Sequence, residues 1–343
     1  MLTGIYDSAG GDNWTNSNGW MGASGTECTW FGVHCNSSNT AVTAVMLSNN
    51  NLVGSLPVSL DDLPSLQYFD VSENRLSGSL PAIDALASLV SFDAAQNAFS
   101  GPVPNLAGHS ALEAYDVHAN QLTGPIPALT GLGMLSNAYF GGNRLSGSLP
   151  SFAGLTNLAG FSADHNQLTG GIPSLAGLSK LTFFDVNDNA LSGPLPSFAG
   201  LSSVVRFYAY DNRLTGSIPN MSDMVLLGNF NVSNNQLTGT PPSISNLVKL
   251  TSYNVSYNQL TGPAPAILPL PILHVYYIGE NQFTGPPPEL PQPYPLWQGY
   301  VSLCPNGLDH VESADWDYLT ERSPWYQNCV PVTDLIFADG FDP

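Results

Sequence analysis

Residues 63–81 read Leu-Pro-Ser-Leu-Gln-Tyr-Phe-Asp-Val-Ser-Glu-Asn-Arg-Leu-Ser-Gly-Ser-Leu-Pro, and this stretch decides the fold. In its middle, Phe69 and Val71 alternate with polar or amphipathic neighbours. An alternation with a period of two predicts a short strand with one buried face. Before the strand, Leu63 and Leu66 are spaced for a short helical or 3₁₀ turn that closes a coil.

The residues after this strand predict a sharp change of direction. Asn74 turns the chain, and its side-chain amide can bond backbone groups that have no strand partner. Gly78 allows a tight backbone path, and Pro81 stops strand pairing and fixes φ for the return. If copies of this unit stack, their asparagines form a ladder of hydrogen bonds.

The same unit recurs along the chain as the string N-x-L-x-G-x-x-P. It occurs eleven times, with a first step of 24 residues and later steps of 23. One coil cannot bury its own apolar side, so stacked coils must share a continuous core. The spacing therefore predicts an α/β-type repeat solenoid with a parallel sheet. The repeated asparagines are Asn50, Asn74, Asn97, Asn120, Asn143, Asn166, Asn189, Asn212, Asn235, Asn258 and Asn281.

The eleven L-x-G-x-x-P turns resemble the plant-type leucine-rich-repeat family, which includes receptor-kinase ectodomains and polygalacturonase-inhibiting proteins. The resemblance covers about three-quarters of the chain. It extends to Trp14, Trp20 and the stretch Cys28-Thr-Trp-Phe-Gly-Val-His-Cys35, which is similar to the amino-terminal cap of that family. It implies a horseshoe or superhelix with a concave parallel sheet, a mostly 3₁₀ or irregular convex side, and capped ends.

Two features depart from the plant pattern. The step is 23 residues where the plant proteins favour 24, and the convex side has little amphipathic helix. The tail from Leu335 to Phe341 resembles short tails on secreted bacterial proteins, so a secreted bacterial relative is a second interpretation.

Four segments follow from the repeat and its ends. A solenoid exposes apolar core edges at both ends, which caps must cover. We expect an N-terminal cap at 1–41, eleven repeats at 42–290, a C-terminal cap at 291–330 and a tail at 331–343.

The four cysteines fall in two pairs at opposite ends, Cys28 with Cys35 and Cys304 with Cys329. An even number placed this way predicts two disulfides that staple the caps, and an oxidising compartment. Free or metal-bound thiols are the alternative, although no CxxC pair is present. The expected location is therefore secreted, cell-surface or periplasmic.

The balance of charged residues limits the classes of partner that we expect. The formal net charge is −19, from 7 basic and 26 acidic side chains. Such a field disfavours nucleic acid and anionic membrane surfaces, since both are polyanions. It favours basic partners, cations or neutral ligands. No apolar run reaches about 18 residues, so no membrane span is expected.

Acidic residues occupy the expected outward face of three successive strands, as Asp70, Asp93 and Asp116. Neighbouring strands lie about 4.8 Å apart, where two carboxylates repel by roughly 1 kcal/mol in water. Arg75 is the only nearby base. Such a strip either binds a basic group or a cation, or the pKa of its carboxyl groups is raised. A solvated acidic strip without a ligand is the alternative.

Aromatic residues mark the later repeats of the same face. Outward aromatics on an open sheet are suited to protein or sugar contacts, although Tyr and Phe also favour strands in general. The complete predicted ligand-binding set is Asp70, Asp93, Asp116, Tyr139, Phe183, Asp185, Tyr208, Tyr210, Tyr257 and Tyr277.

No catalytic motif is recognisable, and a shallow, wet sheet face does not suit acid–base chemistry. His118 and His165 lie near Asp116 and Asp164 without forming a tight ligand cluster, so no metal or other cofactor is predicted. The leading hypothesis is a non-enzymatic recognition scaffold for a protein or peptide. The alternatives are a cell-wall glycan-binding or adhesion module that takes a polysaccharide, and a structural spacer.

Overall fold

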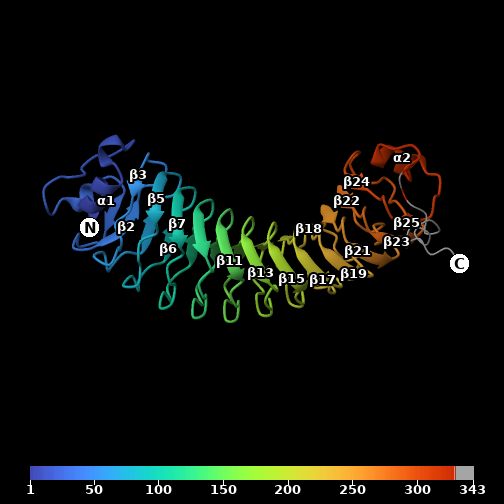
Figure 1. The fold of residues 1–343 in the computed structure, drawn as a ribbon, viewed down its shortest axis with the longest axis horizontal. Coiled ribbons are helices and arrows are strands. Elements are labelled where there is room, and N and C mark those ends of the chain that lie inside the picture. Colours follow the sequence, from blue (N-terminus) through green and yellow to red (C-terminus); the bar gives the residue numbers. More distant parts are fainter. Residues whose placement is uncertain (328, 330–343) are drawn as a thin grey trace. The chain divides into compact units, whose positions relative to one another are not determined.

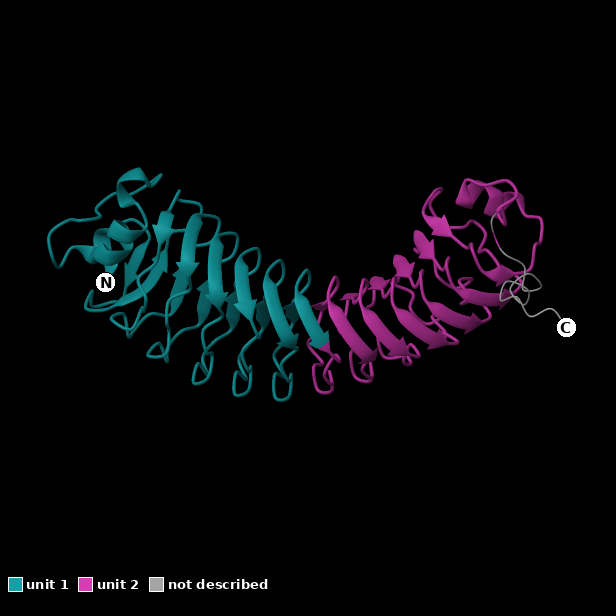
Figure 2. Cartoon of the chain, in the orientation of Figure 1, with its two compact units in different colours: residues 1–169 teal, residues 170–343 magenta. Residues whose placement is uncertain are grey.

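The computed structural model describes residues 1–327 and residue 329, and the chain divides into two compact units, residues 1–169 and 170–343 (Figure 2). Each unit is a stack of coils, and each coil contributes short strands to two parallel sheets (Figure 1). The predicted repeat solenoid is confirmed. The expected tail at 331–343 lies outside the described residues.

In the first unit, the first sheet follows the order β1-β2-β4-β6-β8-β10-β12, and only the β1–β2 pair is antiparallel. A second sheet runs alongside it. The first sheet contains β1 (Val33–Cys35), β2 (Val42–Met46), β4 (Tyr68–Asp70), β6 (Ser91–Asp93), β8 (Ala114–Asp116), β10 (Asn137–Tyr139) and β12 (Gly160–Ser162). The second contains β3 (Val53–Ser55), β5 (Arg75–Ser79), β7 (Ala98–Pro102), β9 (Gln121–Gly124), β11 (Arg144–Ser148) and β13 (Gln167–Gly170).

The second unit repeats this arrangement. Its first sheet contains β14 (Phe183–Asp185), β16 (Arg206–Tyr208), β18 (Asn229–Asn231), β20 (Ser252–Asn254), β22 (Val275–Tyr277) and β24 (Val301–Ser302). Its second sheet contains β15 (Ala190–Pro194), β17 (Arg213–Gly216), β19 (Gln236–Gly239), β21 (Gln259–Gly262), β23 (Gln282–Gly285) and β25 (Gly307–Leu308).

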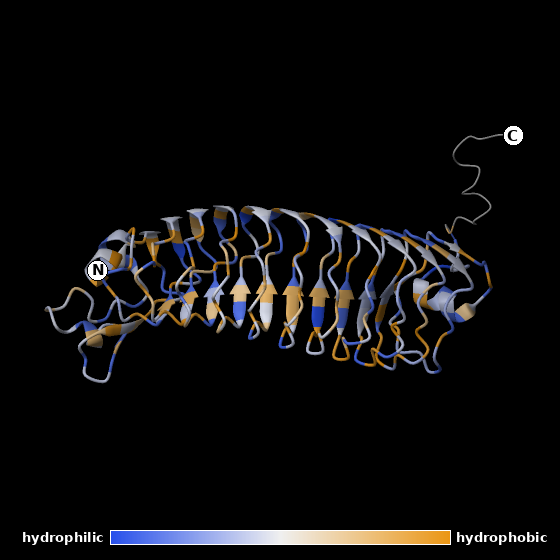
Figure 3. Cartoon of the chain, turned by 90° about the horizontal axis from the view of Figure 1, so that it is seen from below, coloured by the Kyte–Doolittle hydropathy of each residue, from blue (hydrophilic) through white to orange (hydrophobic). Residues whose placement is uncertain are grey.

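The core contains a column of stacked aromatic rings. Phe69, Phe92 and Tyr115 lie in register on β4, β6 and β8, with ring centroids 5.4 and 5.3 Å apart. All three are buried. Each is the inward residue of its strand, and Figure 3 shows that several strands carry both hydrophobic and hydrophilic residues. In-register pairing therefore places the outward residues of successive coils side by side as well.

The asparagine side chains connect neighbouring coils. Asn74 Oδ1 accepts from the backbone N–H of Asn50 and Leu52, at 3.0 and 2.9 Å. Its Nδ2 donates to the carbonyl oxygens of Leu47 and Val71, both at 2.9 Å. The amide thus satisfies backbone groups at the turn, where no strand partner is available.

The same bond to a backbone N–H of the preceding coil recurs along the chain. It is formed by Asn97, Asn120, Asn143, Asn166, Asn212, Asn235, Asn258 and Asn281. Asn189 donates to the carbonyl oxygens of Val186 and Asn187.

The second sheet is a feature that the repeat pattern did not predict. The residues after each asparagine were interpreted as a turn, but they pair in parallel, as β5 does with β7. Gly78 adopts a φ of +79°, which side chains disfavour, and it still belongs to β5. The coil is closed by short hydrogen-bonded turns, in which Leu66 N–H donates to the Leu63 carbonyl.

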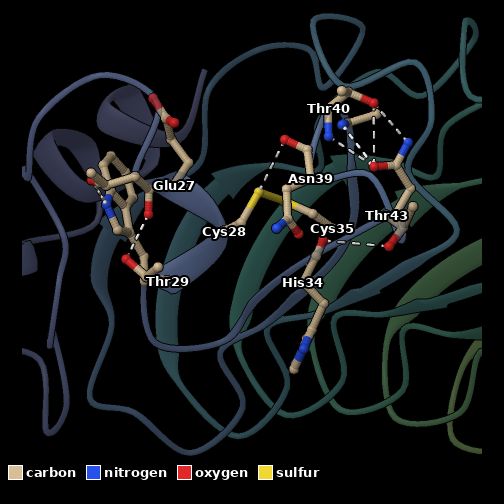
Figure 4. Close-up of a disulfide and its surroundings, with 12 residues drawn as sticks. Glu27, Cys28, Thr29, His34, Cys35, Asn39, Thr40 and Thr43 are labelled. Atoms are coloured by element: carbon tan, nitrogen blue, oxygen red, sulfur yellow. Dashed lines mark hydrogen bonds between the residues drawn. A yellow bond between two sulfur atoms is a disulfide. The ribbon is translucent and has the colours of Figure 1, made fainter.

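The N-terminal cap consists of α1 (Leu2–Ser8), two 3₁₀ turns (Gly11–Asn13 and Glu27–Thr29) and a cluster of tryptophans. Trp20 contacts Trp14 and Trp30, with ring centroids 4.8 and 5.2 Å away. The Cys28–Cys35 disulfide forms as predicted, with Asn39 beside it and the His34 side chain pointing away (Figure 4).

At the other end, the first part of the expected cap continues the repeat. β24 and β25 pair with β22 and β23, and Asn306 Oδ1 accepts from Phe283 N–H at 2.9 Å. After this additional coil comes α2 (Ala314–Thr320), and the Cys304–Cys329 disulfide closes the cap.

Candidate functional site

The predicted ligand-binding residues lie mainly on what we call the strand face: the outward side chains of the first sheet in each unit, with the residues that directly follow each strand. Alternation along the strand places them there, since the inward residues fill the core. The face is described for each unit separately.

Three carboxylates form a strip on the strand face of the first unit. Asp70 pairs in register with Asp93, and Asp93 pairs with Asp116. Each also accepts a backbone hydrogen bond from the residue two positions later; for Asp70 the donor is Ser72 N–H, at 3.0 Å. These bonds hold each carboxylate against its own strand end.

The repulsion within the strip is relieved in two ways. Burial, with a smaller contribution from the carboxylates of Asp116 and Asp70, raises the pKa of Asp93 to about 6. Asp116 Oδ1 lies 2.7 Å from Nδ1 of His118, and this contact raises the pKa of His118. Arg75, the expected neutralising base, lies in β5 of the second sheet. His118, two residues after Asp116, therefore has the role that the sequence analysis gave to Arg75.

A hollow of about 260 Å³ adjoins the strip. Its polar lining comes from Ser91, Asp93, Asp116, Asn137 and Tyr139. The Tyr139 hydroxyl donates to Asn137 Oδ1 at 2.9 Å, and this fixes the ring beside the carboxylates. The first unit thus presents an acidic hollow with one aromatic wall.

An aromatic cluster occupies the start of the strand face in the second unit. The rings of Phe183 and Tyr208 meet edge to face with centroids 6.3 Å apart, and Tyr208 and Tyr210 do so at 6.4 Å. Asp185 is buried and accepts from the backbone N–H and the side-chain Nδ2 of Asn187. Asp185 therefore supports the chain locally, while the three half-buried rings form the accessible surface.

Amides and hydroxyls follow this cluster along the sheet. Asn231 and Asn254 pair in register on β18 and β20. Each Oδ1 accepts from the backbone N–H and hydroxyl of the serine two positions later, as the carboxylates of the first unit accept from their own chain. With Oδ1 engaged, the Nδ2 groups remain as donors toward a ligand.

Tyr277 and Tyr257 lie near the far end of this sheet, one on a strand and the other in a turn. Tyr277 is an outward residue of β22, as predicted. Tyr257 lies in the turn after β20, with a φ of +54°, and its side chain is 59% exposed. Both line a cavity of about 480 Å³ that also involves Glu280 and Arg322. The sequence analysis named neither Glu280 nor Arg322 as a site residue. The spacing of the repeats does not reveal that Arg322, in the cap, lies next to them.

Other site types find little support in the described part of the chain. No group of three or more His, Cys, Asp or Glu side chains there could hold a metal ion. His165 Nδ1 lies 2.9 Å from Asp164 Oδ2, and Asp164 also accepts from the Ser162 hydroxyl. None of the described helices is long and apolar enough for a membrane crossing.

Comparison with known proteins agrees with this architecture. The family model described as Leucine Rich Repeat matches residues 65–84. Protein STRUBBELIG-RECEPTOR FAMILY 1 of Arabidopsis thaliana is 39% identical over 66 residues, which cover 19% of this chain and 8% of that protein.

Two solved plant structures extend the similarity. One is the leucine-rich-repeat ectodomain of the Arabidopsis thaliana membrane receptor kinase GASSHO1/SCHENGEN3 in complex with CASPARIAN STRIP INTEGRITY FACTOR 2. It has a TM-score of 0.81 and 25% identity, over 94% of this chain and 43% of that one. The other is the Arabidopsis receptor kinase HAESA with the peptide hormone IDA and the co-receptor SERK1. It has a TM-score of 0.68 and 29% identity, over 84% and 52%.

The chain has the fold of a leucine-rich-repeat solenoid, and the family model matches one of its repeats. Its repeats are similar to those of plant receptor-kinase ectodomains. The chain spans less than a tenth of the curated relative and about half or less of these two solved chains. The suggested bacterial relationship rests on the tail, which lies outside the described residues.

Proposed function

We propose that this protein is a non-enzymatic, secreted or cell-surface recognition scaffold that binds an extended peptide or protein segment on its strand face. Support comes from the in-register rows of outward Asp, Tyr and Asn side chains, which repeat at the spacing of the strands. An extended ligand that crosses several strands meets one such set per coil. Solved proteins of similar fold hold a peptide hormone or another named factor.

The two units suit different parts of a ligand. The acidic hollow around Asp93 and Asp116 favours a Lys or Arg side chain, since a basic group there relieves carboxylate repulsion. The ring cluster around Tyr208 favours an apolar or aromatic side chain. The two disulfides are compatible with an oxidising, extracellular location.

A fluorescence titration tests the peptide-binding proposal. The probes are a pool of basic peptides and a pool of neutral peptides, and the readout is tyrosine and tryptophan emission. We expect a saturable change with the basic pool that is reduced at least tenfold in the Tyr208→Ala/Tyr210→Ala double variant. Tyr318→Ala is the matched control, because that exposed tyrosine lies in α2 of the cap. Equal loss of signal in the control would argue against the strand face.

A glycan ligand is the second candidate, and the amide row favours it. Nδ2 donors of Asn231 and Asn254, placed between tyrosines, suit sugar hydroxyls and ring faces. The same titration with neutral cell-wall oligosaccharides separates the two. A response to the sugars that the double variant abolishes, without a response to either peptide pool, would replace the peptide proposal. No response to either class of ligand would favour the structural spacer.

A further inference from the structure

Exposed apolar side chains gather along one edge of the second unit. They lie in or next to the turns that precede the strands of the first sheet, on successive coils. Their exposed fractions range from 38% to 52%. We call this set the edge stripe, and its members are Val205, Val225, Leu226, Val248, Leu268, Ile272, Trp297 and Tyr300.

Backbone hydrogen bonds hold the turns of neighbouring coils side by side. Gly228 N–H donates to the Val205 carbonyl at 2.9 Å, and Trp297 N–H donates to the His274 carbonyl at 3.0 Å. The same type of bond joins the coils between them. The Trp297 indole stacks on the His274 ring and meets the Tyr300 ring edge to face, with ring centroids 4.4 and 5.7 Å apart. The stripe is thus a continuous surface rather than a set of isolated side chains.

The corresponding turns of the first unit are mainly polar. Gln67, Glu113 and Asn157 lie in these turns, and Met134 is an exposed apolar exception. Coils of the same length therefore fold with polar residues at this edge, and the repeat does not require apolar ones there. The difference between the units points to a role of the stripe outside the folding of the chain.

The exposed area of the stripe suits a protein interface. Its eight side chains expose roughly 700 Å² together, since large apolar residues present about 150–250 Å² each and nearly half of that is accessible here. A stable interface buries about 800 Å² per partner, whereas the apolar patches of monomers rarely exceed a few hundred Å². The stripe and its rim are therefore large enough to hold two proteins together.

The charges beside the stripe favour a second copy of this chain as the partner. The two central turns carry one acid, Asp223, and one base, Lys249, on neighbouring coils. Their charges cancel, whereas the whole chain has a net charge of −19. Two copies can therefore approach each other through this edge without the repulsion that their acidic surfaces impose elsewhere. The acid and the base are also placed to pair with each other across a two-fold axis.

We propose that the edge stripe is the interface of a symmetric dimer, in which the second unit of one copy packs against the second unit of another. A two-fold axis between the coils of Asp223 and Lys249 places the Asp223 of each copy opposite the partner's Lys249. The same axis brings Val205 opposite the partner's Ile272. The stripe lies where the strands begin, so the strand faces of both copies stay open to a ligand. This inference does not depend on the proposed peptide-binding function.

Sedimentation velocity of the full-length protein at about 1 to 100 µM measures the association. We expect a shift from one chain mass to two as the concentration rises. Leu226→Glu introduces a carboxylate into the apolar contact of both copies and should weaken dimerisation at least about 100-fold. Met134→Glu is the matched control and should leave the association unchanged. Leu226 and Met134 are similarly exposed, and each lies nine residues before the ladder asparagine of its coil.

A charge exchange tests the two-fold arrangement. Lys249→Glu alone brings two carboxylates together at each end of the contact and should weaken the dimer about tenfold or more. The Asp223→Lys/Lys249→Glu double variant restores the pair in exchanged order and should recover most of the association. Asp223 also accepts from Gly200 N–H at 2.8 Å, so the thermal unfolding of the double variant is compared with that of the wild type.

The outcomes decide between the dimer and other uses of the stripe. A wild-type chain that stays monomeric over the whole concentration range overturns the proposal, and binding of that monomer to phosphatidylcholine vesicles would assign the stripe to a membrane instead. Equal weakening by Met134→Glu, or a dimer that survives Leu226→Glu, places the contact elsewhere. Assemblies larger than two chains, or a double variant that folds but does not recover, contradict the symmetric arrangement. None of these measurements involves a ligand, so their failure leaves the peptide-binding proposal untouched.

Discussion

Replacing Asp93 by Asn should stabilise the protein at neutral pH. In the folded state, burial and the two flanking carboxylates raise the pKa of Asp93 from 3.8 to about 6. A shift of this size corresponds to roughly 3 kcal/mol when the group is ionised, at about 1.4 kcal/mol for each pKa unit. Since Asp93 is only half-buried, solvent screening reduces the expected effect to about 1–2 kcal/mol.

The backbone should tolerate this change. The Asp93 carboxylate accepts from Ala95 N–H at 3.0 Å. Asn231 and Asn254 occupy the same position in other coils and accept the same bond, also at 3.0 Å. The substitution therefore keeps the hydrogen bond and removes the charge.

The pH dependence follows from the direction of the shift. The folded protein binds the Asp93 proton more tightly than the unfolded chain, so this group contributes stability below about pH 4. The contribution is lost as the pH rises through about 6. The raised pKa of His118 acts in the same direction, so the variant must be compared with wild type at each pH.

Urea unfolding followed by circular dichroism, at pH 7.5 and at pH 4, measures the difference. We expect Asp93→Asn to exceed wild type by about 1–2 kcal/mol at pH 7.5 and to match it at pH 4. Asp62→Asn, at an exposed residue between β3 and β4, is the control for the change in net charge. A variant that is less stable at pH 7.5, or that gains equally at both values, would refute the reasoning.

Three further predictions concern the scaffold. Asn143→Ala should cost about 2–4 kcal/mol in urea unfolding, because the buried N–H of Leu122 loses its acceptor; an effect below 1 kcal/mol would contradict the ladder. Phe207→Ala should cost about 3–5 kcal/mol, since the ring stacks at 5.4 and 5.8 Å on its two neighbours; a Phe207→Leu variant should lose much less. Replacing both Cys28 and Cys35 by Ser opens a short loop and should cost roughly 2–3 kcal/mol, seen as earlier loss of tryptophan fluorescence from the N-terminal cap; unchanged unfolding would argue that the bond is not structural.

The first sheet and its core could be predicted because their determinants are local and periodic. Phe69 and Val71 alternate with polar residues in one short stretch, and the same alternation returns in each coil. The second sheet was missed for a physical reason. Its strands contain glycine at a left-handed φ, as at Gly78, and such residues have low strand propensity. Pairing with the neighbouring coil overrides that preference.

The site was only partly predictable. The row from Asp70 to Asp116 follows directly from the repeat step, but its neutralisation by His118 depends on a side-chain contact that the spacing does not reveal. The cavity at Arg322 is lined by residues of the repeats, such as Ser256, and by residues of the cap. These residues come together only where the cap meets the repeats. Rows of strand-face residues follow from the period of the repeat, whereas individual side-chain contacts such as those of His118 and Arg322 do not.

Asp93 and Asn231 occupy equivalent positions in their coils. This equivalence has a consequence for how proteins of this kind diversify. Either residue closes the same hydrogen bond to its own chain, so the backbone is indifferent to which one is present. The surface charge of each coil can then change by one unit without a change in geometry. A lineage could adjust ligand preference coil by coil through such exchanges, at little risk to folding. The charge pattern of the strand face is thereby separated from the hydrogen bonds that close each strand end.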